Sequence, residues 1–440
     1  MSVPTLSRGT LALILSATGL ATLPSIGHAL PSLAPANCAG CHGNPTISTT
    51  PGSGGFLKFG NNGNTLVGMI SSGQFTIANT TVNQSLPGGG FTGSFPGAVG
   101  PFAPTTSQAF VGGTAGADGK KYLTPGQSDT LTYTYAPTVR GANTSTLSFT
   151  PTNGFNSPPT VTITLQGQGV APVVNLDTSK TNAGNVRIGT TGSVQATVKN
   201  VGDGNLSGLG DVSNLHGSVT AGSGAFTGSG GSFNLLDGGS QTFAYLFAPT
   251  SHGAASVNVN VTTSNGSSDG HNSAQGPTPV ALSGTGVAPV YHSSVAPGGT
   301  LSFSDVVHGA TLSISNLTTD ADLGALTDLT LLSAQISGAD AGMFSLVNFA
   351  SGMQLGKDDT FDLGLNFTSG LPGSHSALLT LLTDEGAALG ASGHAFTYLL
   401  SANSIAPAVP EPGSLQLMLA GLIATGALMR LRRKAPRRDA

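Results

Sequence analysis

The sequence predicts an all-β protein built from three β-sandwiches in tandem, and two observations carry this prediction: the composition and an internal repeat. Charged residues make up only 8% of the 440 residues, so the surface helix formers Glu, Lys and Arg are scarce. The chain contains 65 Gly and 26 Pro, which suits short strands joined by turns. A chain of this length has room for about two to four domains with cores of their own.

Two sequence markers return along the chain at nearly the same spacing. Tyr-Thr-Tyr-Ala-Pro-Thr at residues 133–138 comes back as Tyr-Leu-Phe-Ala-Pro-Thr at 245–250, a spacing of 112, and a weaker copy stands 120 residues further on at 365–370. Leu-Gln-Gly-Gln-Gly-Val-Ala-Pro-Val at 165–173 comes back as Leu-Ser-Gly-Thr-Gly-Val-Ala-Pro-Val at 282–290, a spacing of 117. Because the two markers are independent, they indicate three tandem units.

Each unit reads in the same way, as about seven short segments in which polar and apolar residues alternate. An early segment of each unit stops at an asparagine that can form the following turn, namely Asn79, Asn200 or Asn316. Short alternating strands at this density are typical of a β-sandwich. The predicted units are residues 45–173, residues 174–290 and a divergent third unit at residues 291–405.

This order of motifs resembles the Hydin-type immunoglobulin-like repeat, which is called choice-of-anchor D in bacterial surface proteins. The resemblance covers about residues 45–405, and the third copy lacks the Ala-Pro-Thr marker and the closing Gly-x-Gly. It implies three immunoglobulin-like sandwiches displayed on a surface, and it brings no catalytic residues.

The joints between the units contain proline. Val170-Ala171-Pro172 and its copy at 287–289 each place a fixed φ angle at the boundary, so we expect each joint to be short and fairly stiff.

The N-terminus predicts export. Arg8, the apolar run to Leu23 and small residues around Gly27 and Ala29 are typical of a secretory signal peptide, which assigns residues 1–29 to the signal. Residues 30–44 then form a linker that contains both cysteines of the chain.

That linker carries the Cys-x-x-Cys-His pattern of c-type haem attachment. The thiols of Cys38 and Cys41 have the spacing that adds to two haem vinyl groups, and His42 is the candidate axial ligand of the iron. A disulfide between the two cysteines, or capture of a metal ion by the same three residues, are open alternatives. The surrounding sequence lacks the helices of a cytochrome c. Met69, a tempting sixth ligand, lies in an apolar run that predicts a buried strand position instead.

The C-terminal residues 406–440 read as a sorting tail. Residues 413–429 are uncharged and would make about 25 Å of helix, near the short limit for crossing a bilayer. A basic stop follows at Arg430, Arg432, Arg433 and Lys434, which predicts a transmembrane helix with a cytoplasmic C-terminus.

Val409-Pro410-Glu411-Pro412 stands directly before that run, and the whole tail resembles the PEP-CTERM sorting signal. The resemblance implies processing by an exosortase after export and only transient anchoring in the inner membrane. Plain anchoring without processing is the alternative reading.

The body of the chain shows no catalytic set at a useful spacing. Its histidines are scattered among predicted loops. Three short stretches that begin at Asp118, Asp203 and Asp320 could each lend oxygens to a calcium ion, but none continues into an EF-hand loop, and such residues are typical of tight turns. The net charge is −4 and no basic patch is present, which argues against nucleic acid as a partner.

Together these features predict a non-enzymatic protein of the cell surface or extracellular matrix with a structural or adhesive role. Its expected partners are the export machinery and the exosortase, with exopolysaccharide or other matrix components as candidates, and no cofactor is expected. The alternative is a surface-tethered electron carrier with covalent haem c at Cys38, Cys41 and His42.

Overall fold

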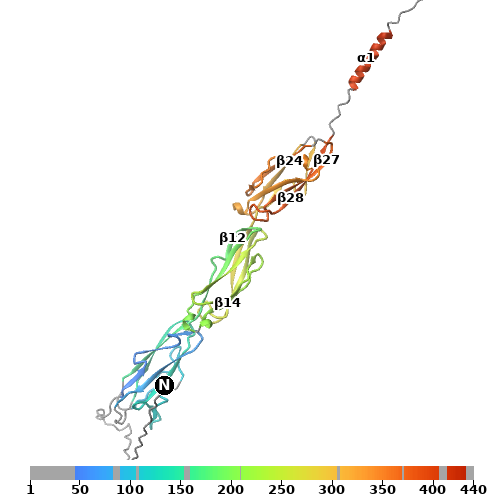
Figure 1. Ribbon diagram of the computed structural model, residues 1–440. Helices are drawn as coiled ribbons and strands as arrows, with labels where there is room; N and C mark the ends of the chain where they lie inside the picture. Colours follow the sequence, from blue (N-terminus) through green and yellow to red (C-terminus); the bar gives the residue numbers. More distant parts are fainter. Residues whose placement is uncertain are drawn as a thin grey trace, which may run out of the picture. The chain divides into compact units, whose positions relative to one another are not determined.

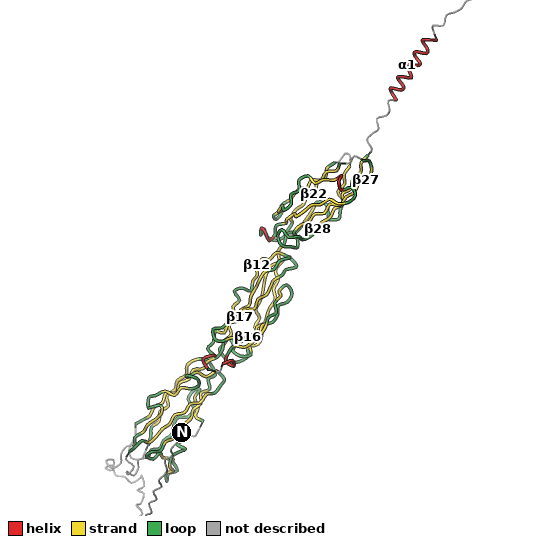
Figure 2. The backbone as a smooth tube through the Cα atoms, in the orientation of Figure 1, coloured by secondary structure: helices red, strands yellow, loops and turns green. Residues whose placement is uncertain are grey.

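The computed structural model describes residues 45–82, 90–105, 109–152, 159–208, 210–304, 308–368, 371–405 and 414–432. These residues are predominantly β, so the all-β prediction is confirmed (Figure 1; Figure 2). They form two compact units. The first unit comprises the described residues up to Gly167, except Asn64–Met69 and Pro137–Gly141. These two segments belong to the second unit, together with the residues from Gln168 onward.

The first sandwich is made by ten strands. They are β1 (Ile47–Thr50), β2 (Phe56–Lys58), β3 (Asn64–Leu66), β4 (Ser71–Asn79), β5 (Phe102–Pro104), β6 (Thr114–Ala115), β7 (Lys121–Tyr122), β8 (Ser128–Tyr135), β9 (Gly141–Phe149) and β10 (Val161–Val170). One sheet has the order β1-β4-β8-β5. In the other, β2 and β3 pair parallel with successive segments of β10, which also pairs with β9, while β6 and β7 pair with each other in a small separate sheet. Both sheets send side chains into one core, so they pack face to face.

Aromatic rings fill much of this first core. The rings of Phe95 and Phe149 stack with centroids 4.4 Å apart, and those of Phe102 and Tyr135 stack at 4.9 Å. The described part of the chain segment that connects β4 to β8 forms mainly isolated β-bridges and very short strands. Large rings therefore supply packing where ladder hydrogen bonds are few.

Because of Tyr133 on β8, the free energy of unfolding of this sandwich is expected to fall at alkaline pH. Its side chain is fully buried, its hydroxyl donates to the Pro96 carbonyl oxygen at 2.6 Å, and burial raises its pKa to about 12. An unfolded tyrosine ionises near pH 10, so between about pH 10 and 12 the unfolded state loses its proton first and stability falls.

We expect Tyr133→Phe to lower the free energy of unfolding by about 1 kcal/mol at pH 7, because one buried hydrogen bond is lost. Between about pH 10 and 12 the variant should lose stability less steeply than the parent protein. Urea unfolding followed by circular dichroism measures both effects. Tyr122→Phe, at a less buried position, is the control. Identical pH slopes for the parent and Tyr133→Phe would show that Tyr133 is not the titrating group.

The second sandwich lies wholly in the second unit. Its strands are β11 (Val174–Asp177), β12 (Asn182–Arg187), β13 (Gly192–Asn200), β14 (Leu215–Val219), β15 (Phe226–Thr227), β16 (Gly231–Leu235), β17 (Ser240–Phe247), β18 (Gly253–Thr263) and β19 (Gln275–Val287). The sheets have the orders β11-β13-β17-β15 and β12-β19-β18-β14-β16 and share one core. The 3₁₀ turns η3 (Gly204–Ser207) and η4 (Gly210–Ser213) precede β14.

The third sandwich repeats that topology strand for strand. Its strands are β20 (Tyr291–Ser293), β21 (Thr300–Ser304), β22 (Gly309–Asn316), β23 (Leu329–Ser337), β24 (Phe344–Leu346), β25 (Met353–Leu355), β26 (Thr360–Phe367), β27 (Gly373–Thr383) and β28 (Ala395–Ser404). Their orders are β20-β22-β26-β24 and β21-β28-β27-β23-β25, with the turns η5 (Gly324–Leu326) and η6 (Ala341–Met343). The third sandwich thus keeps the strand order of the second although its sequence has diverged.

The strand orders are those of an immunoglobulin-like sandwich. In each of the last two sandwiches the N-terminal stretch is shared between the sheets, because β11 pairs antiparallel with β13 while β12 pairs parallel with β19. Likewise β20 pairs antiparallel with β22, and β21 pairs parallel with β28. One four-stranded sheet thus faces a sheet built around the last two strands, which confirms the predicted immunoglobulin-like class.

One prediction needs correction and one is met only in part. The run predicted to cross the membrane forms the helix α1 (Ser414–Arg432), and among the residues that the structure describes no helix is long and apolar enough to span a membrane. Met69 is 45% exposed in a turn after β3 and is not a core residue.

Candidate functional site

Most residues predicted to carry function lie outside the described residues. This holds for the haem-attachment candidates Cys38, Cys41 and His42, for the sorting motif from Val409 to Pro412, and for Arg433 and Lys434. Of the basic stop, Arg430 is an exposed residue of α1, and Arg432 is the last residue of that helix. These assignments stay predictions. The structure reveals a different site, at the joint between the second and third sandwiches.

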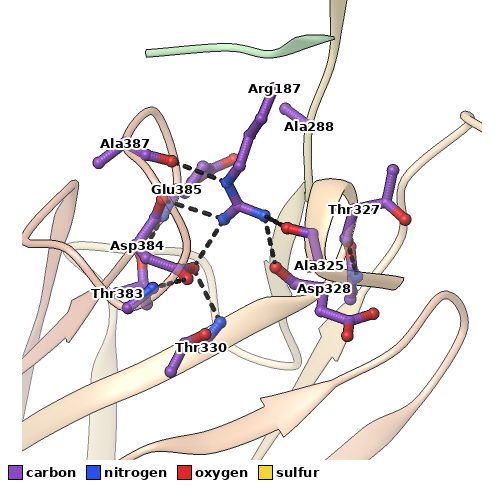
Figure 3. A network of polar contacts seen from close by, with 12 residues as sticks. Arg187, Ala288, Ala325, Thr327, Asp328, Thr330, Thr383, Asp384, Glu385 and Ala387 are labelled. Atoms are coloured by element: carbon purple, nitrogen blue, oxygen red, sulfur yellow. Dashed lines mark hydrogen bonds and ion pairs between the residues drawn. The ribbon is translucent and has the colours of Figure 1, made fainter. Parts of the chain in front are cut away.

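Arg187 is the centre of this joint, and its strand explains why it points there. It is the last residue of β12, opposite Val287, the last residue of β19. The chain then turns back at Thr190, which donates from both its backbone NH and its hydroxyl to the Arg187 carbonyl oxygen, at 3.0 and 2.7 Å. The side chain therefore leaves the end of the second sandwich and enters the third (Figure 3).

All five N–H groups of the Arg187 guanidinium have an acceptor in the third sandwich. Nε donates to the Ala387 carbonyl oxygen at 2.7 Å, and Nη1 donates to the carbonyl oxygens of Ala325 and Asp328 at 3.1 and 2.9 Å. Nη2 donates to the Asp384 carbonyl oxygen at 3.3 Å and pairs with its Oδ1 at 3.0 Å. Since a guanidinium has five donors, this group is fully satisfied although only 2% of the side chain is exposed.

Asp384 is equally enclosed, with 0% of its side chain exposed. Besides Arg187, its Oδ1 accepts the backbone NH of Thr330 at 2.8 Å, and its Oδ2 accepts the NH of Gly390 at 2.8 Å. The carboxylate thus ties β23, the β27–β28 loop and Arg187 together. A buried ion pair is tolerated only when its remaining hydrogen-bonding capacity is met in this way.

Burial changes the electrostatics of the joint. Desolvation lowers the pKa of Arg187 from its ordinary value, and the charges of Asp384 and Asp328 oppose that change. Burial also raises the pKa of Asp328; the nearby Asp322 adds to the rise, and Arg187 counteracts it. The guanidinium is the positive charge that offsets this acidic end of the third sandwich.

The turn after Arg187 packs directly against the third sandwich. Gly189 has φ +85°, and a Cβ there would meet the carbonyl oxygen of Gly386 and lie 2.8 Å from the Cα of Ala387. Only a residue without a side chain fits this approach. The joint therefore combines a buried side chain with a backbone contact.

Asp320 fixes the linker at the same joint. Its Oδ2 accepts the backbone NH of Ala288 at 2.9 Å and contacts Nδ1 of His252 at 2.8 Å. Lys357 donates from Nζ to the Asp320 carbonyl oxygen at 2.7 Å. The linker alanine is thus held by the sandwich that follows it, while His252 belongs to the loop before β18 of the preceding one.

The second unit contains a matching arrangement one repeat earlier. Oδ1 of Asp203 accepts the NH of Ala171 at 2.8 Å and the Nε–H of Arg140 at 3.0 Å. Asp203 and Asp320, which the sequence predicted as turn residues, therefore hold the linkers in place. Arg140 takes the part that His252 plays in the later copy.

Two buried asparagines complete the linker contacts. Asn200 accepts the NH of Val173 at 3.0 Å, and Asn316 accepts the NH of Val290 at 3.0 Å. Asn316 also donates to the carbonyl oxygens of Thr327 and Leu355, at 2.7 and 3.1 Å. The asparagines that end the early strand of these units therefore anchor the backbone of each linker.

We expect Asn316→Ala to lower the free energy of unfolding by about 3 kcal/mol, because it removes the side-chain partner of three backbone groups, two of them buried. Asn348→Ala is the matched control, since Asn348 also makes two hydrogen bonds to backbone groups but is exposed. Its cost should stay below about 1 kcal/mol. Urea unfolding measures both variants, and equal losses would contradict the assigned role of Asn316.

The first copy of the joint motif replaces the charged pair by uncharged residues. Leu66 pairs with Val170 as Arg187 pairs with Val287, so Leu66 and Arg187 are equivalent. The residue equivalent to Asp384 is Ser264. Each donates its backbone NH to the second residue of a corresponding strand, Asp384 to the Thr330 carbonyl oxygen in β23 and Ser264 to the His216 carbonyl oxygen in β14. The acidic partner is thus present where the arginine is present, and both are absent together in the other copy.

A polar depression lies on the second sandwich, and all its lining residues come from that one sandwich. The ring of His216 there uses Nε2 to contact the Asp211 carbonyl oxygen at 2.6 Å. The lining residues are His216, Gly217, Ser218, Ser232, Phe233, Asn234, Gln241, Thr262, Thr263 and Ser264. In the part of the chain that the structure describes, no group of three or more His, Cys, Asp or Glu residues is placed to hold a metal ion.

Comparison with known proteins adds little to this geometry. No protein-family model matches the sequence, so the two family resemblances have no matching model, and no curated protein matches it either. Similar solved structures include the Escherichia coli adhesin FdeC, at 15% identity over 83% of this chain and 99% of that chain, with a TM-score of 0.26.

Two further solved structures are similar at the same low level. Three N-terminal domains of the outer capsid protein Hoc of bacteriophage RB49 share 11% identity over 80% of this chain and 99% of that chain, with a TM-score of 0.24. PcdhgB3 EC1-4 shares 12% identity over 78% and 72%, with a TM-score of 0.30. Scores this low carry no argument about function. The fold and the joint, taken by themselves, define a tandem array of immunoglobulin-like sandwiches.

Proposed function

We propose that this protein is an exported, non-enzymatic structural or adhesive protein of the cell surface or extracellular matrix. The buried Arg187 joint is the observation that supports this best, because a fully satisfied guanidinium holds two sandwiches in one arrangement. A protein that spaces or connects other components needs such fixed joints. The groups in this joint are saturated by one another, an arrangement suited to holding structure and not to turning over a substrate.

The ends of the sequence support the location. The predicted signal at residues 1–29 and the motif from Val409 to Pro412 bracket the sandwiches, so export followed by exosortase processing is part of the proposal. The export machinery and the exosortase are the proposed partners in transit, and exopolysaccharide or other matrix components are the proposed partners outside. No cofactor is part of this function.

Cell fractionation, protease treatment of intact cells and intact-mass measurement test the proposal together. We expect the mature protein at the surface or in the medium, with a mass that lacks residues 1–29 and the tail beyond the Pro-Glu-Pro motif. Alanine at Pro410, Glu411 and Pro412 should leave the C-terminal tail uncleaved. Lys199→Ala, in an exposed ion pair with Asp177, is the control that leaves processing unchanged. Mature protein found only in the cytoplasm would exclude the proposed role.

A second candidate function rests on the Cys-x-x-Cys-His pattern at residues 38–42. Two thiols and an adjoining imidazole at this spacing would attach haem c, and the sandwiches would then carry a redox group. Protein matured in the periplasm should in that case show a Soret band and the added mass of haem, and both should vanish in the double variant Cys38→Ser, Cys41→Ser. A mass equal to the bare polypeptide would end this candidate.

A further inference from the structure

We infer that the third sandwich carries a guanidinium-binding cradle, and that its occupation by Arg187 makes the second and third sandwiches one cooperative folding unit. The inference concerns how the sandwiches depend on each other, and it does not depend on where the protein is located.

The cradle consists entirely of residues from the third sandwich. Three backbone carbonyl oxygens, from Ala325, Asp328 and Ala387, and both the carbonyl and the carboxylate of Asp384 converge on one point (Figure 3). Acceptors arranged in this way match the planar fork of a guanidinium, and an ammonium group has only three donors for them.

An empty cradle would be unfavourable for the third sandwich. Asp384 would keep its hydrogen bonds from Thr330 and Gly390 but would lose its only cationic partner in the joint, while remaining fully buried. The carbonyl oxygens of Ala325, Asp328 and Ala387 would also lose their guanidinium donors. Removing one member of a buried pair is far more costly than the pair is worth, so the loss of Arg187 destabilises the neighbour more than its own sandwich.

A backbone contact at the joint couples the sandwiches in the same direction. Gly189 lies against Gly386 and Ala387 of the β27–β28 loop, next to Asp384. Within the third sandwich, the backbone NH of Tyr291, the first residue of β20, donates to Oε1 of Glu385 at 3.2 Å, so this loop also contacts the strand that follows the linker. Opening the second sandwich at β12 therefore removes support from a loop that bridges the last two strands of the third.

Hydrogen exchange read by mass spectrometry on the full chain tests the inference. In the parent protein the slowest amides of β18–β19 and of β27–β28 should share one opening free energy and one dependence on urea. Arg187→Ala should separate the two sets and lower protection in β27–β28 by about 100-fold, while protection in β18–β19 falls less. Arg187→Lys should also separate them, because an ammonium cannot replace the fork.

The matched control is Arg140→Ala, which removes a guanidinium from a pair in which 34% of the arginine side chain is exposed. It should leave the shared opening of β18–β19 and β27–β28 intact. Separate opening free energies in the parent protein, or parent-like exchange in Arg187→Ala, would overturn the cooperative unit. Parent-like exchange in Arg187→Lys would overturn the requirement for a guanidinium.

Should Arg187→Ala fail to fold, chemical rescue decides the matter. Refolding in about 10 mM methylguanidinium but not in methylammonium at the same concentration supports the cradle, because only the former offers the fork. Failure in both solutions would overturn it.

Discussion

Replacing Arg187 by leucine is expected to lower the free energy of unfolding of the joined sandwiches by about 3–5 kcal/mol. The substitution leaves the buried carboxylate of Asp384 without its cation and four carbonyl oxygens without guanidinium donors. Urea unfolding followed by circular dichroism and by hydrogen exchange in β27–β28 measures the loss.

The chain itself supplies the compensating change for this variant. The equivalent positions one repeat earlier are Leu66 and Ser264, so the double variant Arg187→Leu, Asp384→Ser imports an arrangement that the protein already uses. We expect the double variant to lose only about 2 kcal/mol, since no buried charge remains. Arg140→Leu, at an exposed pair, should cost less than about 1 kcal/mol. A double variant as unstable as Arg187→Leu would disprove the charge argument.

The second large effect is expected at Gly189. Alanine there adds a Cβ to a residue with φ +85° and drives it into the backbone of Gly386, so we expect a loss of roughly 3 kcal/mol. Gly184→Ala, in β12 just before that turn, is the control, because Gly184 has φ +67° but open space around it. It should cost roughly 1 kcal/mol.

The two glycine variants are compared by the urea midpoint and by hydrogen exchange in the β27–β28 loop. Gly189→Ala should expose that loop, since the contact with Gly386 and Ala387 must open. Gly184→Ala should leave the loop protected. Equal losses in the two variants would mean that left-handed backbone strain alone acts at Gly189 and that the approach to the third sandwich contributes nothing.

The fold was predictable because period-two alternation and repeated markers report directly on buried faces. The all-β class and the immunoglobulin-like sandwich follow from them, and Asn200 and Asn316 were visible as strand ends. Their role in anchoring Val173 and Val290 was not, since a turn asparagine and a linker anchor look the same in a sequence.

The joint was missed for a physical reason. Arg187 ends a short strand next to glycines, where a lone basic residue reads as solvated surface, and its acceptors are mostly backbone carbonyls, which every residue has. Asp384 lies far along the chain in a different unit of the repeat. One signal was available in the comparison of the repeats. When Val170 is aligned with Val287, Leu66 corresponds to Arg187, and Asp384 is present only in the copy that has the arginine.

The tail shows the opposite limit. Its uncharged run predicted a helix correctly, because few residues there disfavour one, and α1 covers Ser414–Arg432. Crossing a bilayer also requires about 20 predominantly apolar residues, and among the described residues no helix is long and apolar enough to span a membrane.

The parallel pairing of the second and last strands in the second and third sandwiches has a mechanical consequence. β12 runs parallel to β19, and β21 runs parallel to β28. When two parallel strands are pulled from the N-terminal end of one and the C-terminal end of the other, their connecting hydrogen bonds are loaded together in shear and do not open one after another. Tension that reaches these parallel pairs would thus meet resistance from several hydrogen bonds at once, and Arg187, at the end of β12, ties the pair in the second sandwich to the third.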